Sequence, residues 1–161
     1  MLKIKDADIR SLTDFPLKWR WTNPKWNQLS NADLQRIKPL TQTKAKELWR
    51  IFGHYVLGNG PRENIFECRP WIDATVDYPG AFDRVRDWLL VQFSDREQDV
   101  VVSWDKDNAV VTSWGVFCDY WDDFCYPASD DVAVLPPSVD WVLFYQHGER
   151  FVFGKKRVKA A

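Results

Sequence analysis

Hydrophobic and polar residues follow different patterns in the two halves of the chain. In the first half, apolar side chains recur at spacings of three and four, as in helices with one buried face. Two such stripes are Leu48, Ile51, Phe52 and Tyr55, and Phe82, Val85, Trp88 and Leu89. In the second half, β-branched and aromatic runs alternate with turn residues, which is typical of strands. This order predicts helices first and consecutive antiparallel strands afterwards.

Capping residues place the first helices. Ser30 or Asn31 can cap a short helix over residues 30–37, which ends at Pro39. Thr41 or Thr43 can cap the stronger helix that follows. The two helices are therefore separate elements.

Breaks and prolines delimit the rest of the first half. Residues 58–61 (Gly-Asn-Gly-Pro) form a clear break. Pro79 fits the first turn of a third helix, with Asp77 as its cap. Residues 18–22 alternate charged and aromatic side chains, which favours a short strand.

A hairpin opens the second half. Residues 99–104 and 109–114 are β-branched runs joined by the turn residues 105–108. Aromatic residues at helical spacing then predict a short helix: Phe117, Tyr120, Trp121 and Phe124. Further strands are expected at 131–135, 141–146 and 150–153, with one earlier strand at 64–68.

The predicted fold class is α+β. We expect an antiparallel sheet of about five strands, mostly in the C-terminal half, with about three to four helices packed on one face. The N-terminal aromatic segment would cover the other face. The length of 161 residues fits a single domain over 1–161. Residues 1–30 are expected to be irregular, and residues 155–161 to form a flexible basic tail.

Composition narrows the function classes. The formal net charge of −1 argues against a general nucleic-acid binder. The sequence contains no signal peptide and no apolar run of membrane-helix length, which predicts a cytoplasmic protein that does not enter membranes. The odd count of three cysteines, without a close pair, predicts reduced thiols rather than disulfides or a zinc site. No metal or cofactor is expected.

Ten tryptophans make the chain unusually aromatic. Four of them lie on helix stripes or at strand ends and are predicted to be core residues: Trp49, Trp88, Trp104 and Trp114. Trp121 is expected to face the core as well. Trp19, Trp21 and Trp26 lie among polar and basic residues, so we expect partial exposure and a lid over the sheet.

Catalytic motifs are missing from the sequence. His54 and His147 are the two histidines, and capping or packing roles explain both. The chain has no nucleophile elbow, P-loop or HExxH helix. A Cys–His pair formed by the fold stays open. Residues 105–108 have too few ligands for a calcium loop, so a turn is preferred. We therefore predict a non-enzymatic protein.

Acidic residues cluster in one aromatic-rich stretch. The predicted binding residues for a protein partner are Asp119, Tyr120, Asp122, Asp123, Tyr126, Asp130 and Asp131. One interpretation is the solvated side of an amphipathic helix. A second is a negative surface that attracts a basic partner, with aromatic anchors beside it. A third alternative is a small-molecule pocket lined by tryptophans.

Two resemblances add to this picture. Residues 37–40, Leu48-Trp49, residues 112–117 and Trp121 resemble a small bacterial family of unknown function, which implies a similar single domain and no particular activity. Residues 129–132, 141–145 and 149–154 more loosely resemble the closing strands of bacterial toxin-immunity proteins. That resemblance implies an inhibitor that blocks a toxin by covering it.

The function hypothesis combines these points. We expect a protein-binding domain, of the immunity-inhibitor type, that acts by steric and electrostatic blocking. The alternatives are a small-molecule-binding or enzymatic domain with an aromatic pocket, and a structural subunit of an oligomer or complex. The oligomeric state stays open.

Overall fold

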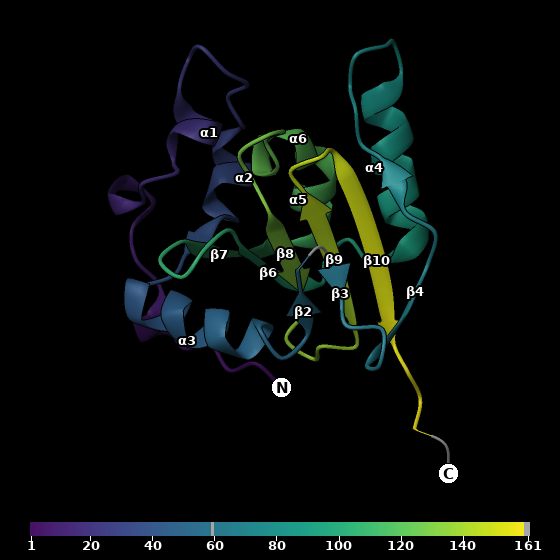
Figure 1. Ribbon diagram of the computed structural model, residues 1–161. Coiled ribbons are helices and arrows are strands. Elements are labelled where there is room, and N and C mark those ends of the chain that lie inside the picture. Colours follow the sequence, from purple (N-terminus) through teal and green to yellow (C-terminus); the bar gives the residue numbers. More distant parts are fainter. Residues whose placement is uncertain (59, 160–161) are drawn as a thin grey trace.

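The computed structural model describes residues 1–58 and 60–159 (Figure 1). Asn59, in the predicted break at 58–61, and Ala160 and Ala161, at the end of the predicted tail, lie outside the described residues.

One eight-stranded antiparallel sheet forms the centre of the fold. Its strands, in spatial order, are β1 (Lys38–Pro39), β7 (Ala109–Ser113), β6 (Asp99–Ser103), β8 (Val132–Leu135), β9 (Trp141–Gln146), β10 (Arg150–Lys156) and β4 (Phe66–Cys68), with β5 (Ile72–Asp73) also paired to β10. The predicted α+β class and antiparallel sheet are confirmed. The sheet has more than the expected five strands because short segments of the N-terminal half extend its edges. Segments of two or three residues are too short to show a periodic pattern.

The register gives the sheet two apolar faces. Val101 lies opposite Val111, and both pack in one buried cluster. Val102 lies opposite Val110, and both pack in the other. We call the side of Val102 the aromatic face, because its cluster holds all five buried tryptophans: Trp21, Trp104, Trp114, Trp121 and Trp141. The side of Val101 is the aliphatic face.

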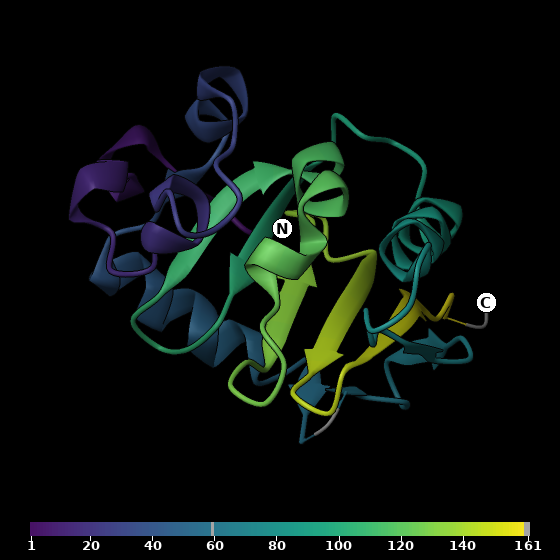
Figure 2. The same ribbon diagram turned by 90° about the horizontal axis from the view of Figure 1, so that it is seen from above.

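Helices cover both faces of the sheet (Figure 2). The aromatic face packs against α1 (Trp19–Thr22), α4 (Ala81–Gln92), α5 (Trp114–Asp119) and α6 (Trp121–Phe124), and α2 (Asn31–Gln35) lies at its margin. The aliphatic face packs against α3 (Gln42–Phe52) and the separate hairpin of β2 (Val56–Leu57) and β3 (Gly60–Pro61). The prediction of helices on one face was therefore wrong. Strands that are apolar on both sides need cover on both sides.

The N-terminal aromatic segment lies on the aromatic face, together with α5 and α6, and not on the opposite face as predicted. It includes two 3-10 turns, η1 (Asp6–Asp8) and η2 (Leu12–Asp14). The Phe15 and Trp21 rings stack at a centroid distance of 6.0 Å, and Trp21 lies 5.1 Å from the ring of Phe124. Aromatic rings gain most from neighbouring rings, and these are on the aromatic face.

In the segment 18–22, residues Trp19–Thr22 form the helix α1 rather than the predicted strand. Arg20 and Trp21 are both buried, whereas Trp19 is 36% exposed. Two consecutive buried residues conflict with the period of two that a half-buried strand requires. The alternation of charge and aromaticity was misleading because the charged Arg20 points inward.

Helix starts were predicted with mixed success. Ser30 caps α2 by accepting a hydrogen bond from the Asp33 N–H, and Thr41 caps α3 by accepting one from Lys44. The third helix, α4, begins only at Ala81, after Gly80, which has a left-handed φ of 84°. Pro79 therefore lies before the helix, and the Asp77 cap was wrong. A residue in the left-handed conformation cannot be part of the helix, so α4 starts after Gly80, and glycine adopts that conformation without steric cost.

Two of the expected core tryptophans are not fully buried. Trp49 is 45% exposed and Trp88 is half-buried, whereas Trp104, Trp114 and Trp121 are buried as predicted. Trp49 follows Leu48 by one position, which rotates it about 100° away from the buried stripe of α3. Trp21, expected to be partly exposed, is fully buried.

The predicted tail begins as part of the sheet. Lys155 and Lys156 complete β10 and pair with β4, and the Arg157 N–H donates to the Ile65 carbonyl. The basic C-terminal residues are thereby held beside the core. In the described part of the chain, no helix has the length and apolarity needed to cross a membrane.

Candidate functional site

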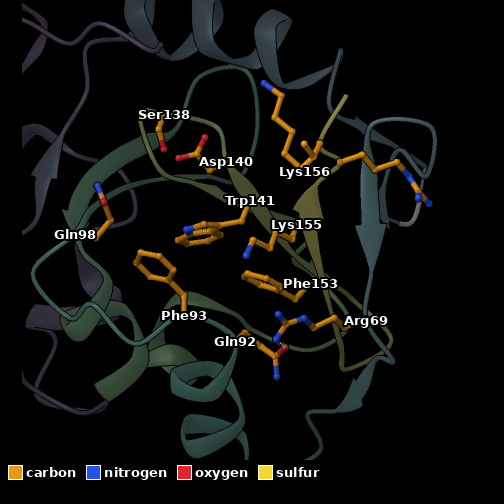
Figure 3. Close-up of a pocket in the computed structure, with 12 residues that line it drawn as sticks. Arg69, Gln92, Phe93, Gln98, Ser138, Asp140, Trp141, Phe153, Lys155 and Lys156 are labelled. Atoms are coloured by element: carbon orange, nitrogen blue, oxygen red, sulfur yellow. Dashed lines mark hydrogen bonds between the residues drawn. The ribbon is translucent and has the colours of Figure 1, made fainter. Parts of the chain in front are cut away.

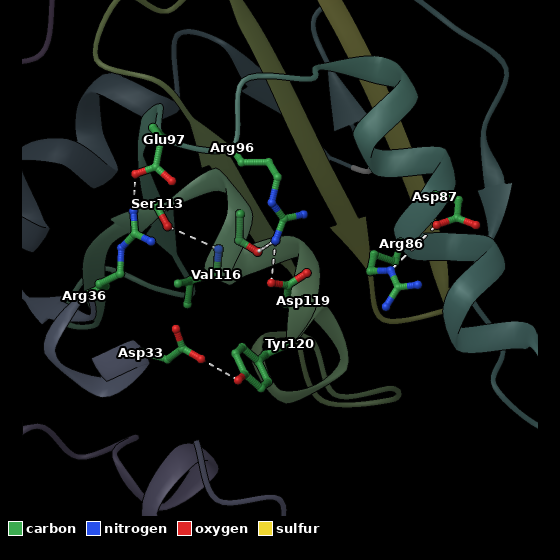
Figure 4. Close-up of polar contacts among 11 residues, drawn as sticks. Asp33, Arg36, Arg86, Asp87, Arg96, Glu97, Ser113, Val116, Asp119 and Tyr120 are labelled. Atoms are coloured by element: carbon green, nitrogen blue, oxygen red, sulfur yellow. Dashed lines mark hydrogen bonds and ion pairs between the residues drawn. The ribbon is translucent and has the colours of Figure 1, made fainter. Parts of the chain in front are cut away.

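The acidic stretch folds as two short helices that lie over the aromatic face. Ser113 caps α5 by accepting a hydrogen bond from the Val116 N–H (Figure 4). Tyr120 separates α5 from α6, with φ −128° and ψ 29°. The predicted single helix is therefore divided into two, with Asp119 at the end of α5 and Asp122 and Asp123 in α6.

Asp119 is paired rather than free. The Arg96 guanidinium donates to the Asp119 carboxylate, and both side chains are partly exposed (Figure 4). The Arg96 carbonyl also accepts from the Gly115 N–H. A Cβ at Gly115 would lie only 3.0 Å from that carbonyl, so glycine permits the close approach. The charge of Asp119 is thus largely balanced within the protein.

Tyr120 is held by a residue distant in sequence. Its hydroxyl donates to the Asp33 carboxylate of α2 at 2.6 Å (Figure 4). This hydrogen bond, then burial, raises the pKa of Tyr120 to about 12. The contact connects α2 to α5 and fixes the orientation of the phenol ring.

Asp130 lies in the interior. It forms a two-pronged ion pair with Arg20, in which Nη2 donates to Oδ1 at 3.1 Å. The Tyr126 N–H also donates to Asp130, at 2.8 Å. Both charged side chains are buried. The pair therefore links α1 to the loop before β8, and Asp130 is not available to a partner.

Asp123 is also buried. One of its carboxylate oxygens has no hydrogen-bond partner among the residues that the structure describes. Burial, and then the charge of Asp122, raises the pKa of Asp123 to about 7. Burial likewise raises the pKa of Asp122, which is partly exposed. Asp123 therefore adds less negative charge near neutral pH than the sequence predicts.

Asp131 is exposed and contacts the turn after β9. Its carboxylate accepts from the His147 N–H and contacts His147 Nδ1, both at 2.9 Å. Among the seven predicted residues, Asp123 and Asp130 are buried, Asp131 is exposed, and the other four are partly buried. The fold does not assemble them into one acidic surface.

The fold does assemble three aromatic side chains at the surface, which we call the surface aromatic cluster: Trp19, Trp26 and Tyr126. The Trp19 and Tyr126 rings stack at 5.4 Å, and Trp26 lies 6.2 Å from Trp19. Trp19 is 36% exposed and Trp26 is 51% exposed. The buried Arg20 guanidinium lies 4.7 Å from the Tyr126 ring centroid. The ion pair therefore holds the Arg20 guanidinium against the buried side of the cluster.

Sequence reasoning predicted exposure of Trp19 and Trp26 and selected Tyr126, but did not bring them together. The two segments are about a hundred positions apart, and they meet through the Arg20–Asp130 pair and the stacking of Trp19 on Tyr126. The one sequence feature that pointed to this cluster was Arg20, an arginine between two tryptophans. Its meaning depends on knowing its partner.

Other reactive groups have ordinary surroundings. The thiols of Cys118 and Cys125 are buried, and burial raises the pKa of each, so both disfavour the reactive thiolate. Asp105 accepts hydrogen bonds from the N–H groups of Asp107 and Asn108, as expected of a turn. In residues 1–58 and 60–159, no three His, Cys, Asp or Glu side chains are arranged to hold a metal ion.

A family model described as "Protein of unknown function (DUF2947)" matches residues 10–152. The chain belongs to the DUF2947 family. The predicted membership of an uncharacterised family is thereby confirmed, whereas the resemblance to immunity proteins stays a prediction. Searches of curated proteins and of solved structures found no match. The DUF2947 region includes the surface aromatic cluster and its supporting ion pair.

Proposed function

We propose that this DUF2947 protein is a protein-binding domain that anchors its partner on the surface aromatic cluster. The observation that supports this proposal is the surface aromatic cluster itself, in which the exposed Trp19 stacks on Tyr126 and the exposed Trp26 meets both rings at a steep angle, next to a buried ion pair. Tryptophan and tyrosine are the residues that most often dominate binding energy at protein interfaces. An immunity-type inhibitor, which covers a toxin without chemistry, needs such a surface.

Preorganisation strengthens the cluster as an anchor. Arg20 is fixed by Asp130, and its guanidinium lies 5.2 Å from the Trp19 ring and 4.7 Å from the Tyr126 ring. Rings held in place lose little rotamer freedom when a partner binds. Each aromatic side chain can contribute roughly 150–250 Å² of contact area.

Charge has a smaller role than the sequence predicts. Burial is the largest cause of the raised pKa of Tyr126 and the charge of Asp123 the next, whereas the charge of Arg20 lowers the pKa. Asp122 remains near the cluster, because its charge also contributes to the raised pKa of Tyr126. Lys18 and Lys25 belong to the same N-terminal segment and offset part of the negative charge. The proposed mechanism is therefore mainly steric, with Asp122 and Asp131 as the acidic residues that could still steer a basic partner.

The test uses the full chain and two variants. Wild type, Trp19→Ala/Trp26→Ala and the control Trp49→Ala are immobilised and exposed to lysate of the native host. Trp49 is 45% exposed on the other side of the sheet, so its loss removes a comparable indole. We expect one protein retained in equimolar amount by wild type and Trp49→Ala. Its affinity for the double variant should fall at least about tenfold, as for a typical hot spot.

Two outcomes would overturn the proposal. The first is equal retention of the same proteins by the double variant. The second is a wild-type dimer in solution that the double variant converts to a monomer, because the cluster would then be an oligomer interface. If a partner is found, Asp122→Lys and Asp131→Lys should slow its association and weaken the dependence of association on salt. Their effect on affinity should be smaller than that of Trp19→Ala/Trp26→Ala.

A further inference from the structure

A groove at the opposite margin of the aromatic face has chemistry that the protein-binding proposal does not use. It lies between the end of α4 and strands β9 and β10, and encloses about 500 Å³ (Figure 3). That volume is within the range of small-molecule sites, roughly 300–1,000 Å³. The groove shares no residue with the surface aromatic cluster.

The floor of the groove consists of packed aromatic rings. Trp141 and Phe153 stack at 5.4 Å and are only 4% and 1% exposed. Phe93, which is partly exposed, lies 5.1 Å from Trp141. Electrostatic interactions over such a floor are less screened than over open surface. The buried rings cannot offer a full stacking face, so recognition must depend on the polar rim.

One end of the rim is cationic. Lys155 lies opposite Trp141 in the register and points to the same face, beside Arg69 (Figure 3). Arg69 donates to Gln92 Oε1 at 3.0 Å, and its guanidinium lies 5.6 Å from the Phe153 centroid. Lys156 and Arg157 line the margin. Within the described chain, none of these four cations has a carboxylate at ion-pair distance.

The opposite end of the rim is polar and contains an acid. Gln98, Ser138 and Asp140 lie beyond Trp141, away from Arg69 (Figure 3). Asp140 would repel a polyanion that continued along the groove, but can accept hydrogen bonds from hydroxyl or amino groups. The groove is therefore polarised, with donors at one end and an acceptor at the other.

We propose that the groove binds a small phosphorylated molecule, with its phosphate at Arg69 and Lys155 and its hydroxyl groups at Ser138 and Asp140. Arginine presents several N–H donors that match phosphate oxygens, and lysine adds a compact charge. Among the residues that the structure describes, no carboxylate lies at ion-pair distance from either cation, and Arg69 keeps N–H donors besides the one bonded to Gln92. Such a site would make the protein a small-molecule-binding domain, which is one of the alternatives from the sequence, and it requires no catalysis.

The test follows the indole N–H and backbone amide signals of the full chain by two-dimensional NMR. The probes are ribose 5-phosphate, ribose and inorganic phosphate. We expect ribose 5-phosphate to shift the signals of Trp141 and Gln98 saturably, phosphate to do so more weakly, and ribose to have no effect. Charge-assisted bonds contribute about 1.5–3 kcal/mol each, so Arg69→Gln/Lys155→Gln should weaken binding at least about tenfold.

A matched control removes the same charge elsewhere. Lys46→Gln/Lys106→Gln alters two exposed lysines near the β6–β7 turn, at the other end of β6 from Gln98. This control and Trp19→Ala/Trp26→Ala should bind ribose 5-phosphate like the wild type. Circular dichroism checks that each variant is folded.

Three results would overturn the proposal. The first is unchanged Trp141 signals at millimolar ribose 5-phosphate and phosphate. The second is equal weakening by the groove and control variants. The third is tighter binding of single-stranded DNA with steep salt dependence, which would indicate a nucleic-acid surface instead. Each of these results is independent of whether the surface aromatic cluster binds a protein.

Discussion

The two faces of the sheet are covered in different ways. On the aliphatic face, one amphipathic helix, α3, supplies Ala45, Leu48 and Phe52 in a regular stripe. On the aromatic face, α4 is joined by the short helices α1, α5 and α6 and by irregular segments, and these three short helices contain the buried Trp21, Trp114 and Trp121. Large rings let short segments bury substantial area without long regular elements. The tryptophan content therefore reflects how one face is built.

The two faces also differ in their buried charged residues. The aromatic face contains the buried Arg20–Asp130 pair and Asp123, whereas the buried cation of the aliphatic side, Lys44, pairs with the half-exposed Glu47. Buried charges require fixed partners, so they tie irregular segments to one arrangement. Both proposed sites lie at the margins of the aromatic face, where those segments end.

The largest expected effect compares a core residue from each face. Trp114 is fully buried, lies 5.0 Å from Trp141, and donates from its indole to the Phe93 carbonyl at 2.7 Å. Trp114→Ala should lower the free energy of unfolding by about 3–5 kcal/mol, and Leu48→Ala by about 2–3 kcal/mol. Urea denaturation measures both. An equal or larger loss for Leu48→Ala would mean that the aromatic face is not the more strongly constrained.

Next in size is the loss of the buried ion pair. Asp130→Asn leaves Arg20 buried without a carboxylate and should cost about 3 kcal/mol. Replacing both residues with apolar ones, as in Arg20→Met/Asp130→Leu, should cost less than the single change, because no charge is left unpaired. A double-mutant cycle in urea measures the coupling. Additive losses would show that the two side chains do not depend on each other.

A smaller, pH-dependent effect is expected at Asp123. Its folded pKa of about 7 lies above the ordinary value of 3.8, so the unfolded chain loses the proton first as pH rises. Wild-type stability should therefore fall between about pH 4 and pH 7 and stay low above that. Asp123→Asn should gain about 1–2 kcal/mol at about pH 8, and the gain should disappear below about pH 4. A gain independent of pH would contradict the raised pKa.

The smallest effect is expected on the aliphatic side. Lys44 and Glu47 are 3.2 Å apart, and the Glu47 side chain is 50% exposed. Glu47→Gln should change stability by less than about 1 kcal/mol, because solvent screens a half-exposed pair. Thermal unfolding beside Asp130→Asn measures the contrast. A loss as large as that of Asp130→Asn would remove the difference between the two faces.

The elements that the sequence predicted well are those that depend on local pattern. The hairpin of β6 and β7, the strands β8 to β10 and the caps at Ser30 and Thr41 all follow from periodicity or from a single side-chain hydrogen bond. The candidate site was predicted less well, because its residues were chosen for charge and proximity in sequence. Burial then removed Asp123 and Asp130 from the surface.

The sequence by itself determined the α+β class, the antiparallel strands and the aromatic core, since these depend on the period and size of side chains along the chain. Tertiary structure decided which charges are solvated and which aromatics meet. Arg20 looked like a surface residue until the fold placed Asp130 beside it, and Trp19 and Trp26 became a cluster only when Tyr126 packed against them. Lys155, expected in a tail, became part of a groove because β10 continues through it. Long-range contacts set the burial and partners of each side chain, and those determine what a charged or aromatic group can bind.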